Sequence, residues 1–270
     1  MSKGKLQKFA DLESYSNVFQ FPFSVMEHVA FDMKGKWREM YFHNDNPIVL
    51  ELGCGKGDYT IALARRHPEM NFIGVDIKGA RLWKGAKEAT EEKMGNVAFL
   101  RTRIEFIDAF FGPGEVSEIW LTFSDPQLRG SENARLTSPL FLQRYHRFLK
   151  PDGIVHLKTD SRFLYEYTQS VIRANGLEVL ASGTDIYYEP LDFADEATIE
   201  ESLPDLKAVF QVQTFYETMF LKMGLPITYL AFRLAHEGEG FAYPTDFDAA
   251  YWREAEGPRR SFSHQPSKNG

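Results

Sequence analysis

Residues 49–59 read VLELGCGKGDY, an apolar run that ends in an acid and passes into alternating glycines. The run is short and is followed by turn-forming residues, which is typical of a buried strand over 48–52. Gly53, Gly55 and Gly57 carry no Cβ atoms, so a ligand can come close to the backbone where the strand ends. The stretch therefore predicts a strand, a ligand-binding loop and the start of a helix.

The same rhythm continues over residues 47–235, where apolar segments alternate with segments of helical spacing. This alternation predicts an α/β, Rossmann-like domain with a parallel sheet joined by right-handed crossovers. Ligands of such sheets bind at the carboxyl ends of the strands. Further strands are expected at 71–77, 97–102, 118–123, 153–160 and 227–234, and helices at 59–67, 79–92, 137–149 and 161–175.

Two segments flank this domain. Residues 1–46 mix charge with aromatic rings and are expected to form an N-terminal extension. Within it, FQFPF at 19–23 alternates like a strand, but Pro22 argues against one. Residues 236–270 are rich in Gly, Pro, Ser and charge and are expected to form a loosely ordered C-terminal tail, although FAYPTDFDAAYW at 241–252 has enough aromatic rings to dock.

The composition of the chain excludes several classes of protein. Of 270 residues, 43% are hydrophobic, and the net charge of −7 opposes nucleic-acid binding by bulk charge but not through a local basic face. The single cysteine, Cys54, excludes an internal disulfide and fits a reducing compartment. Neither a signal-peptide pattern nor a membrane-length apolar run is present, so we expect a cytoplasmic protein without a membrane span. The histidines lack metal-ligand spacing, so we predict no metal.

The order of the glycines distinguishes between cofactors. The dinucleotide fingerprint is G-x-G-x-x-G, whereas this loop reads E-x-G-x-G-x-G and begins at Glu51. A carboxylate here repels a pyrophosphate and favours a cation, such as a sulfonium or an amino group. Asp76 closes the second strand, where an acid can accept hydrogen bonds from a ribose. We therefore expect S-adenosylmethionine as the cofactor; the alternative is a tight packing turn with no ligand.

Acidic and hydroxyl side chains follow the later strands. FSDP (123–126) and KTD (158–160) end two successive strands, so Asp125 and Asp160 are expected at the same edge of the sheet as the glycine loop. Either acid alone could equally be a helix cap or a turn residue. The motif TFYE before the last strand adds Thr214, Tyr216 and Glu217.

Six segments together resemble the bacterial tRNA (guanine-N7)-methyltransferase family. The first two recur in many class I methyltransferases, whereas the later four are far more specific. The resemblance implies a class I methyltransferase fold with a mostly parallel seven-stranded sheet and helices on both faces. In the family's order, the segments are LELGCGKG (50–57), FIGVDI (72–77), FSDP (123–126), RLTSPLFLQRY (135–145), KTD (158–160) and TFYETMFLKMGLPI (214–227).

The resemblance also implies a role for each matching residue. Glu51 and the loop containing Gly53, Gly55 and Gly57 would face the methionine end of the cofactor, and Asp76 would hold its ribose. The adenine-binding turn corresponds to Thr102, Arg103 and Ile104. Asp125 would lie at the cofactor and the guanine, and Asp125 and Asp160 are the expected catalytic residues. The expected substrate-binding residues are Arg129, Asp160, Thr214, Tyr216 and Glu217.

Two departures from the family pattern bear on the substrate. The family usually reads DPWPKKRHHKRRL where this chain reads DPQLRGSENARL (125–136), which is shorter and has lost most of the basic residues. Each lost phosphate contact weakens RNA binding. In addition, Arg103 stands where the family usually has Asp. A compensating basic surface could come from the N-terminal extension or from one helix face, whose alternative reading is a solvated face: Lys78, Arg81, Lys84 and Lys87.

Three functions follow as hypotheses. The leading one is transfer of a methyl group from S-adenosylmethionine to N7 of a variable-loop guanosine in tRNA, by a monomer or a homodimer. The depleted loop at 125–136 favours instead a methyltransferase of another RNA or of a small molecule. Arg103 favours a catalytically silent homologue that binds RNA or cofactor. A nicotinamide enzyme is opposed by Glu51 and by the glycine order.

Overall fold

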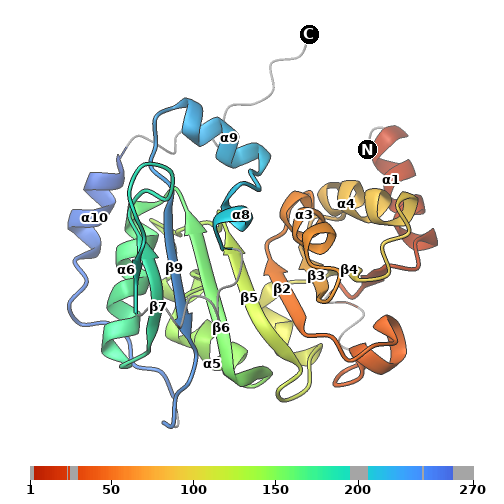
Figure 1. The fold of residues 1–270 in the computed structure, drawn as a ribbon, viewed down its shortest axis with the longest axis horizontal. Helices are drawn as coiled ribbons and strands as arrows, with labels where there is room; N and C mark the ends of the chain where they lie inside the picture. Colours follow the sequence, from red (N-terminus) through yellow and green to blue (C-terminus); the bar gives the residue numbers. More distant parts are fainter. Residues whose placement is uncertain (1–2, 23, 25–29, 195–205, 239, 258–270) are drawn as a thin grey trace.

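The computed structural model describes residues 3–22, 24, 30–194, 206–238 and 240–257. These residues form one nine-stranded sheet, ordered β1-β4-β3-β2-β5-β6-β9-β7-β8, with helices packed on both faces (Figure 1). The strands are β1 (Val18–Gln20), β2 (Ile48–Leu52), β3 (Asn71–Val75), β4 (Val97–Arg101), β5 (Val116–Thr122), β6 (Leu149–Thr159), β7 (Val179–Gly183), β8 (Asp192–Phe193) and β9 (Thr228–Arg233).

The sheet confirms the predicted α/β fold. Strands β4-β3-β2-β5-β6 are neighbours and run parallel, and β9 lies antiparallel between β6 and β7. From β2 the chain moves first toward β3 and β4, and later to the other side through β5 and β6. The topological switch point therefore lies between β2 and β5, where open α/β sheets bind their ligands.

Two short edge strands extend the sheet beyond the seven strands predicted. Strand β1 pairs in parallel with β4 from Val18 to Gln20 and ends before Pro22, which has no N–H to donate to a ladder. Strand β8 pairs with β7. Pro22 weakened the prediction of a strand at 19–23, and the structure shows that three residues before that proline are enough to pair.

The predicted helices are present, with one shortened. The one expected at 137–149 ends at His146, because Leu149 already pairs with Val116 as the start of β6. The described helices are α1 (Lys3–Ser14), α3 (Asp58–Arg66), α4 (Gly79–Glu91), α5 (Pro139–His146), α6 (Arg162–Ala174), α8 (Leu206–Phe210), α9 (Phe215–Lys222) and α10 (Ala249–Glu256), with short helical turns η1 (Arg38–Phe42), η2 (Ile104–Ala109) and η3 (Glu132–Ala134).

Alternate residues of the central strand enter two separate cores. Ile48, Leu50 and Leu52 of β2 pack in the core that contains α5 and α6, whereas Val49 packs in the core that contains α1, α3, α4 and α8. Successive side chains of a strand point to opposite faces, so Glu51 shares the face of Val49. This parity directs the carboxyl group of Glu51 toward α3.

Both flanking segments pack on the domain where the structure describes them. In the N-terminal segment, Trp37 is fully buried and its indole N–H donates to the Phe110 carbonyl at 2.9 Å. In the C-terminal segment, Phe247 packs on Phe163 of α6, with ring centroids 5.1 Å apart. Phe247 lies within 241–252, the part of the tail whose aromatic rings were expected to be able to dock, and it packs on α6. Of the helices in the described ranges, none combines the length and apolarity needed to cross a bilayer.

Candidate functional site

The glycine loop after β2 has the conformation that its sequence requires. Gly53, Gly55 and Gly57 have φ angles of 81°, 57° and 74°, in the left-handed region that residues with a Cβ rarely adopt. At Gly57 a Cβ would also lie 2.7 Å from the Phe99 ring and 3.3 Å from the Cα of Gly85. Glycine therefore lets α3 start close against α4 and leaves the loop backbone open at the switch point.

Two neighbouring cavities lie at this edge of the sheet. The larger has a volume of about 630 Å³ and the smaller about 110 Å³, and both are lined by Gly53 and Arg81. Seven of the nine predicted cofactor residues line one or both of them, whereas Gly57 and Asp125 line neither. Those that line the larger cavity are Gly53, Asp76, Thr102, Arg103 and Ile104, and those that line the smaller cavity are Glu51, Gly53 and Gly55, together with the predicted substrate residue Thr214.

Glu51 is a buried acid at the floor of the glycine loop, with 5% of its surface exposed. Its carboxylate accepts hydrogen bonds from the Thr60 amide at 2.9 Å, from the Thr60 hydroxyl, and from the Thr122 hydroxyl at 2.6 Å. Burial raises the pKa of Glu51 to about 7, and these hydrogen bonds oppose the rise. The carboxyl group thus joins the ends of β2 and β5 to the first turn of α3.

Asp76 fastens the loop from the other side. Its carboxylate accepts the Gly55 amide at 2.9 Å and the Lys78 amide at 2.7 Å. Asp76 directly follows β3 and also lines the larger cavity. Its hydrogen bond to the glycine loop was not predicted from the sequence, where Asp76 was assigned only to a ribose.

The predicted adenine turn joins β4 to η2. Thr102 is buried, with its hydroxyl donating to the Phe21 carbonyl at 2.9 Å, so the turn is tied to the segment after β1. Arg103 is exposed and pairs with Glu105 at 3.2 Å. All three residues of the turn line the larger cavity, together with the half-exposed apolar side chain of Ile77.

Asp125 and Asp160 follow the carboxyl ends of the paired strands β5 and β6. The two strands are still paired where they end, since the Phe123 amide donates to the Lys158 carbonyl at 2.8 Å. Phe123 itself has a φ of 52°, which turns the chain sharply before Asp125. Asp125 is exposed and accepts the Gln127 amide at 2.8 Å, whereas Asp160 is half-buried. The topology thus brings both acids to the predicted edge.

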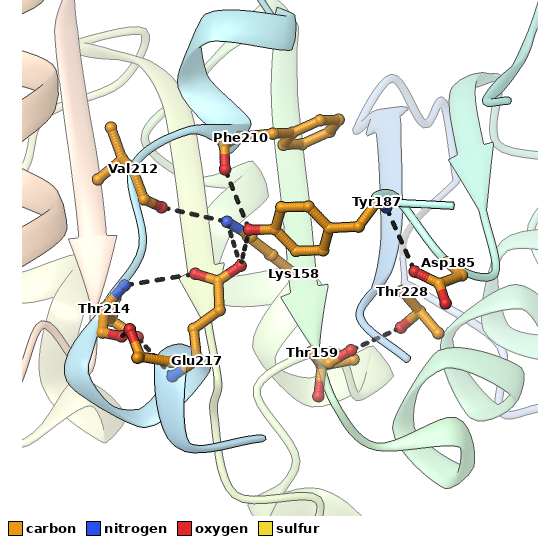
Figure 2. A network of polar contacts seen from close by, with 10 residues as sticks. Lys158, Thr159, Asp185, Tyr187, Phe210, Val212, Thr214, Glu217 and Thr228 are labelled. Carbon is orange, nitrogen blue, oxygen red and sulfur yellow. Dashed lines mark hydrogen bonds and ion pairs between the residues drawn. The ribbon is translucent and has the colours of Figure 1, made fainter. Parts of the chain in front are cut away.

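Glu217 belongs to a buried network rather than to an open wall (Figure 2). Its carboxylate pairs with the Lys158 ammonium at 2.7 Å, and both side chains are fully buried. The Tyr187 hydroxyl donates to the same carboxylate at 2.6 Å. Burial lowers the pKa of Lys158, while the charge of Glu217 opposes that shift. The ion pair connects β6 to α9, and Tyr187 joins the loop after β7 to both.

Thr214 starts α9 with a capping box. The Thr214 hydroxyl accepts the Glu217 amide at 3.1 Å, and the Glu217 carboxylate accepts the Thr214 amide at 3.3 Å. The buried ion pair of Glu217 therefore also fixes where Thr214 stands on the smaller cavity. The side chain of Tyr216 lies outside the described part of the structure.

The known proteins that this chain resembles are methyltransferases. Residues 45–228 match a family described as "Putative methyltransferase". The chain is 52% identical over 238 residues to a protein of Bacteroides thetaiotaomicron named tRNA (guanine-N(7)-)-methyltransferase, with 88% of each chain covered. The chain belongs to the tRNA (guanine-N(7)-)-methyltransferase family. A protein of the same name from Christiangramia forsetii is 49% identical and covers 86% of this chain and 99% of its own.

Solved structures give a more remote likeness to this family member. An antibiotic-related methyltransferase superposes with a TM-score of 0.49 and 14% identity, covering 71% of this chain and 89% of that chain. A 30S ribosomal A1408 methyltransferase from an uncultured bacterium superposes with a TM-score of 0.45 and 16% identity, covering 71% of this chain and 89% of that chain.

The basic residues of this family member divide into paired and open ones. On α4, Lys84 pairs with Asp58 at 2.6 Å and Lys87 with Glu91 at 3.6 Å, so half of the predicted basic face is neutralised. Lys78 and Arg81 are exposed and line the larger cavity instead. Arg129 is exposed in the shortened loop. Lys78 and Arg81 therefore place open positive charge on the larger cavity.

Sequence reading overlooked Lys158, Tyr187 and Arg81 as parts of the site. Lys158 had one signal: a lysine inside an otherwise apolar strand end needs a buried partner. Tyr187 had none, because the loop after β7 carries no motif. Arg81 was read as one of a series on a helix face, and only the structure separates it from Lys84 and Lys87.

Replacing Glu51 by glutamine is expected to change how stability depends on pH. A buried carboxyl whose pKa is about 7, against an ordinary 4.5, favours the protonated form. The contribution of the protonated Glu51 to stability is complete below the ordinary pKa of 4.5. This contribution is lost as the pH rises through the folded-state pKa of about 7. Glu51→Gln keeps a neutral side chain, so its stability relative to wild type should improve by about 2–3 kcal/mol between about pH 5 and pH 8.

Urea unfolding of both proteins at the two pH values measures this difference. Glu13→Gln, which changes an exposed acid on α1, serves as the control and should show no such trend. A pH-independent difference between Glu51→Gln and wild type would show that Glu51 stays ionised in the folded protein.

Proposed function

We propose that this chain transfers the methyl group of S-adenosylmethionine to N7 of a variable-loop guanosine in tRNA. The observation that carries the proposal is the identity of 52% over 88% of the chain to a curated protein of that name. The geometry supports it, since the family's motif residues meet at one edge of the sheet. The protein is proposed to act in the cytoplasm, as a monomer or a homodimer.

The residues around the larger cavity fit the cofactor. A volume of about 630 Å³ is in the range of small-molecule sites. Asp76 offers carboxylate oxygens for ribose hydroxyls, and Ile77 and Leu140 offer exposed apolar surface for a planar base. Gly53 brings open backbone to the methionine end. When bound there, S-adenosylmethionine supplies an electrophilic methyl group on a sulfonium.

The protein's own contribution to the reaction is placement and charge. Guanine N7 carries a free lone pair at neutral pH, so no strong base is required to activate it. Holding two reactants in line can supply about 7–11 kcal/mol of the barrier in well-oriented cases. Asp125 and Asp160 are proposed to accept hydrogen bonds from the N1–H and N2–H groups of the guanine, and both stay ionised. Their negative charge also stabilises the purine as it becomes cationic during methylation.

The RNA backbone is proposed to meet the positive side chains at the mouth of the site. Lys78 and Arg81 are exposed on the larger cavity, Arg129 is exposed in the loop that lines it, and all three side chains are proposed to contact phosphates. Thr214 is proposed to contact the substrate from the rim of the smaller cavity, where the buried Glu217 positions it. Tyr216 remains a proposed substrate residue on the resemblance alone.

A methyl-transfer assay tests the proposed function. Unmodified tRNA transcripts incubated with S-adenosylmethionine labelled in the methyl group should acquire label at about one methyl per transcript. Transcripts made with 7-deazaguanosine, which lacks N7, should acquire none. Label on the 7-deaza transcripts would place the methyl group elsewhere. Cofactor binding without label on any tRNA would favour another substrate or a silent homologue.

A further inference from the structure

The C-terminal segment, residues 240–257, lies beyond the matched family region 45–228 and yet packs firmly on α6. Figure 1 shows α10 beside α6. Asp246 pairs with Arg173 at 2.7 Å, and the Ala242 amide donates to the Asn175 side chain at 2.7 Å. At the other end, the nearly buried Glu256 accepts the Phe163 amide in the first turn of α6 at 2.9 Å. The segment is therefore held at both ends.

The same segment contacts the shortened loop between Asp125 and α5. The Arg253 guanidinium donates to the Leu128 carbonyl at 2.7 Å. The Tyr243 hydroxyl donates to the Asn133 side chain at 2.5 Å. Both partners belong to the stretch DPQLRGSENARL, where this chain departs from the usual family pattern.

That loop forms a wall of the larger cavity. Its residues on the wall are Gln127, Ser131, Asn133 and Ala134. Asn133 therefore lines the cavity and is held from outside by Tyr243. The only regular structure among these residues is the three-residue turn η3, so turn hydrogen bonds, such as that from the Gly130 amide to the Gln127 carbonyl at 3.2 Å, and side-chain contacts set the shape of the loop.

Aromatic packing ties the loop and the C-terminal segment to the same two rings. Arg135, which is 4% exposed, lies over the rings of Phe163 and Tyr167, with its Cζ atom 4.8 Å and 4.5 Å from their centroids. Phe247 of the C-terminal segment packs edge-on against the same rings at 5.1 Å and 5.3 Å. Loop, α6 and C-terminal segment thus form one continuous packed unit.

We propose that Tyr243 and Arg253 are positioning residues that hold the loop 127–135 in the shape that completes the cofactor cavity and presents Arg129 to RNA. A loop ordered before binding avoids the cost of ordering it on binding, which raises affinity without new contacts to the ligand. This preorganisation offsets the loss of basic residues from the loop. The part of the inference that concerns RNA rests on the proposed substrate, whereas the part that concerns the cavity rests only on the proposal that the cofactor binds there.

The test uses the full chain with Tyr243→Phe and Arg253→Ala combined. Without RNA, the dissociation constant for S-adenosylhomocysteine, measured by calorimetry, should rise about five- to tenfold because the cavity wall has loosened. Amide hydrogen exchange should speed up at 127–135 while β6 keeps its protection. With tRNA, the KM should rise more than kcat falls. Tyr243→Phe with Arg253→Lys, which keeps a cationic donor on α10, should restore part of the affinity.

Tyr251→Phe is the matched control, because its ring packs on Trp252 rather than on the loop. It should behave as wild type in every assay. Unchanged affinity and unchanged loop exchange in the double variant would overturn the proposal. Equal loss of protection at 127–135 and at β6 would also overturn it, since the contacts would then serve global stability alone. If wild type methylates no tRNA, the affinity and exchange measurements still decide this inference while the proposed function fails.

Discussion

Replacing Lys158 by methionine is expected to destabilise the fold by about 3–5 kcal/mol, because it leaves the Glu217 carboxylate buried without its cation. Lys158 and Glu217 are both fully buried, and their charged groups lie 2.7 Å apart. Tyr187 and the Thr214 amide still donate to the carboxylate in the variant, but neither carries positive charge. Urea unfolding followed by circular dichroism measures the loss.

A double variant separates the charge from the packing. Lys158→Met with Glu217→Gln removes both charges and keeps the acceptor for Tyr187 and for the cap of α9. Replacing both members of a buried pair often costs little, so most of the lost stability should return. If the double variant is as unstable as Lys158→Met, shape rather than charge governs this site. A loss below about 1 kcal/mol in the single variant would show that the pair is open to solvent.

Replacing Asp160 by asparagine is expected to lower kcat by about 10²–10³, the effect of removing one electrostatic stabiliser from an active site. Asp160 stands at the carboxyl end of β6, beside the turn that carries Asp125. In the proposed reaction its charge stabilises the cationic purine, and an amide cannot replace that charge. The affinity for S-adenosylhomocysteine should stay within about twofold of wild type, because the carboxylate serves the base and not the cofactor.

Asp152→Asn is the control for this experiment. Asp152 is an exposed acid near the opposite end of the same strand, far from the switch point. It should leave kcat, KM and cofactor affinity unchanged. Near-normal turnover in Asp160→Asn would remove Asp160 from the catalytic residues. A parallel loss of cofactor affinity would move its role to the cofactor instead.

The central fold could be predicted because its signals are local. Strand β2 and the glycine loop are adjacent in sequence, and an apolar run followed by Gly53, Gly55 and Gly57 needs no distant partner to be recognised. Strand β1 and helix α10 were not predicted, since each exists through long-range contacts. Val18 pairs with Phe99, and Phe247 packs on Phe163. Segments this short have too few residues for their hydrophobic periodicity to predict a strand or a helix.

For the candidate site, motif positions were predictable and their partners were not. Glu51, Asp76 and Asp125 stand at strand ends, and the doubly wound topology brings strand ends together at the switch point. The hydrogen bond from the Gly55 amide to Asp76 and the ion pair of Lys158 with Glu217 join residues far apart in sequence. Glu217 was therefore read as a substrate residue, although its carboxylate is buried against Lys158.

The most direct measurement is the identity of the methylated nucleoside. Unmodified tRNA transcripts are incubated with the protein and S-adenosylmethionine, digested to nucleosides and analysed by mass spectrometry, and a parallel nuclease digest locates the modified position. We expect 7-methylguanosine at a single position in the variable loop, made with the short DPQLRGSENARL loop as it stands. A methyl group on another atom, or no methylation by protein that binds the cofactor, would contradict it.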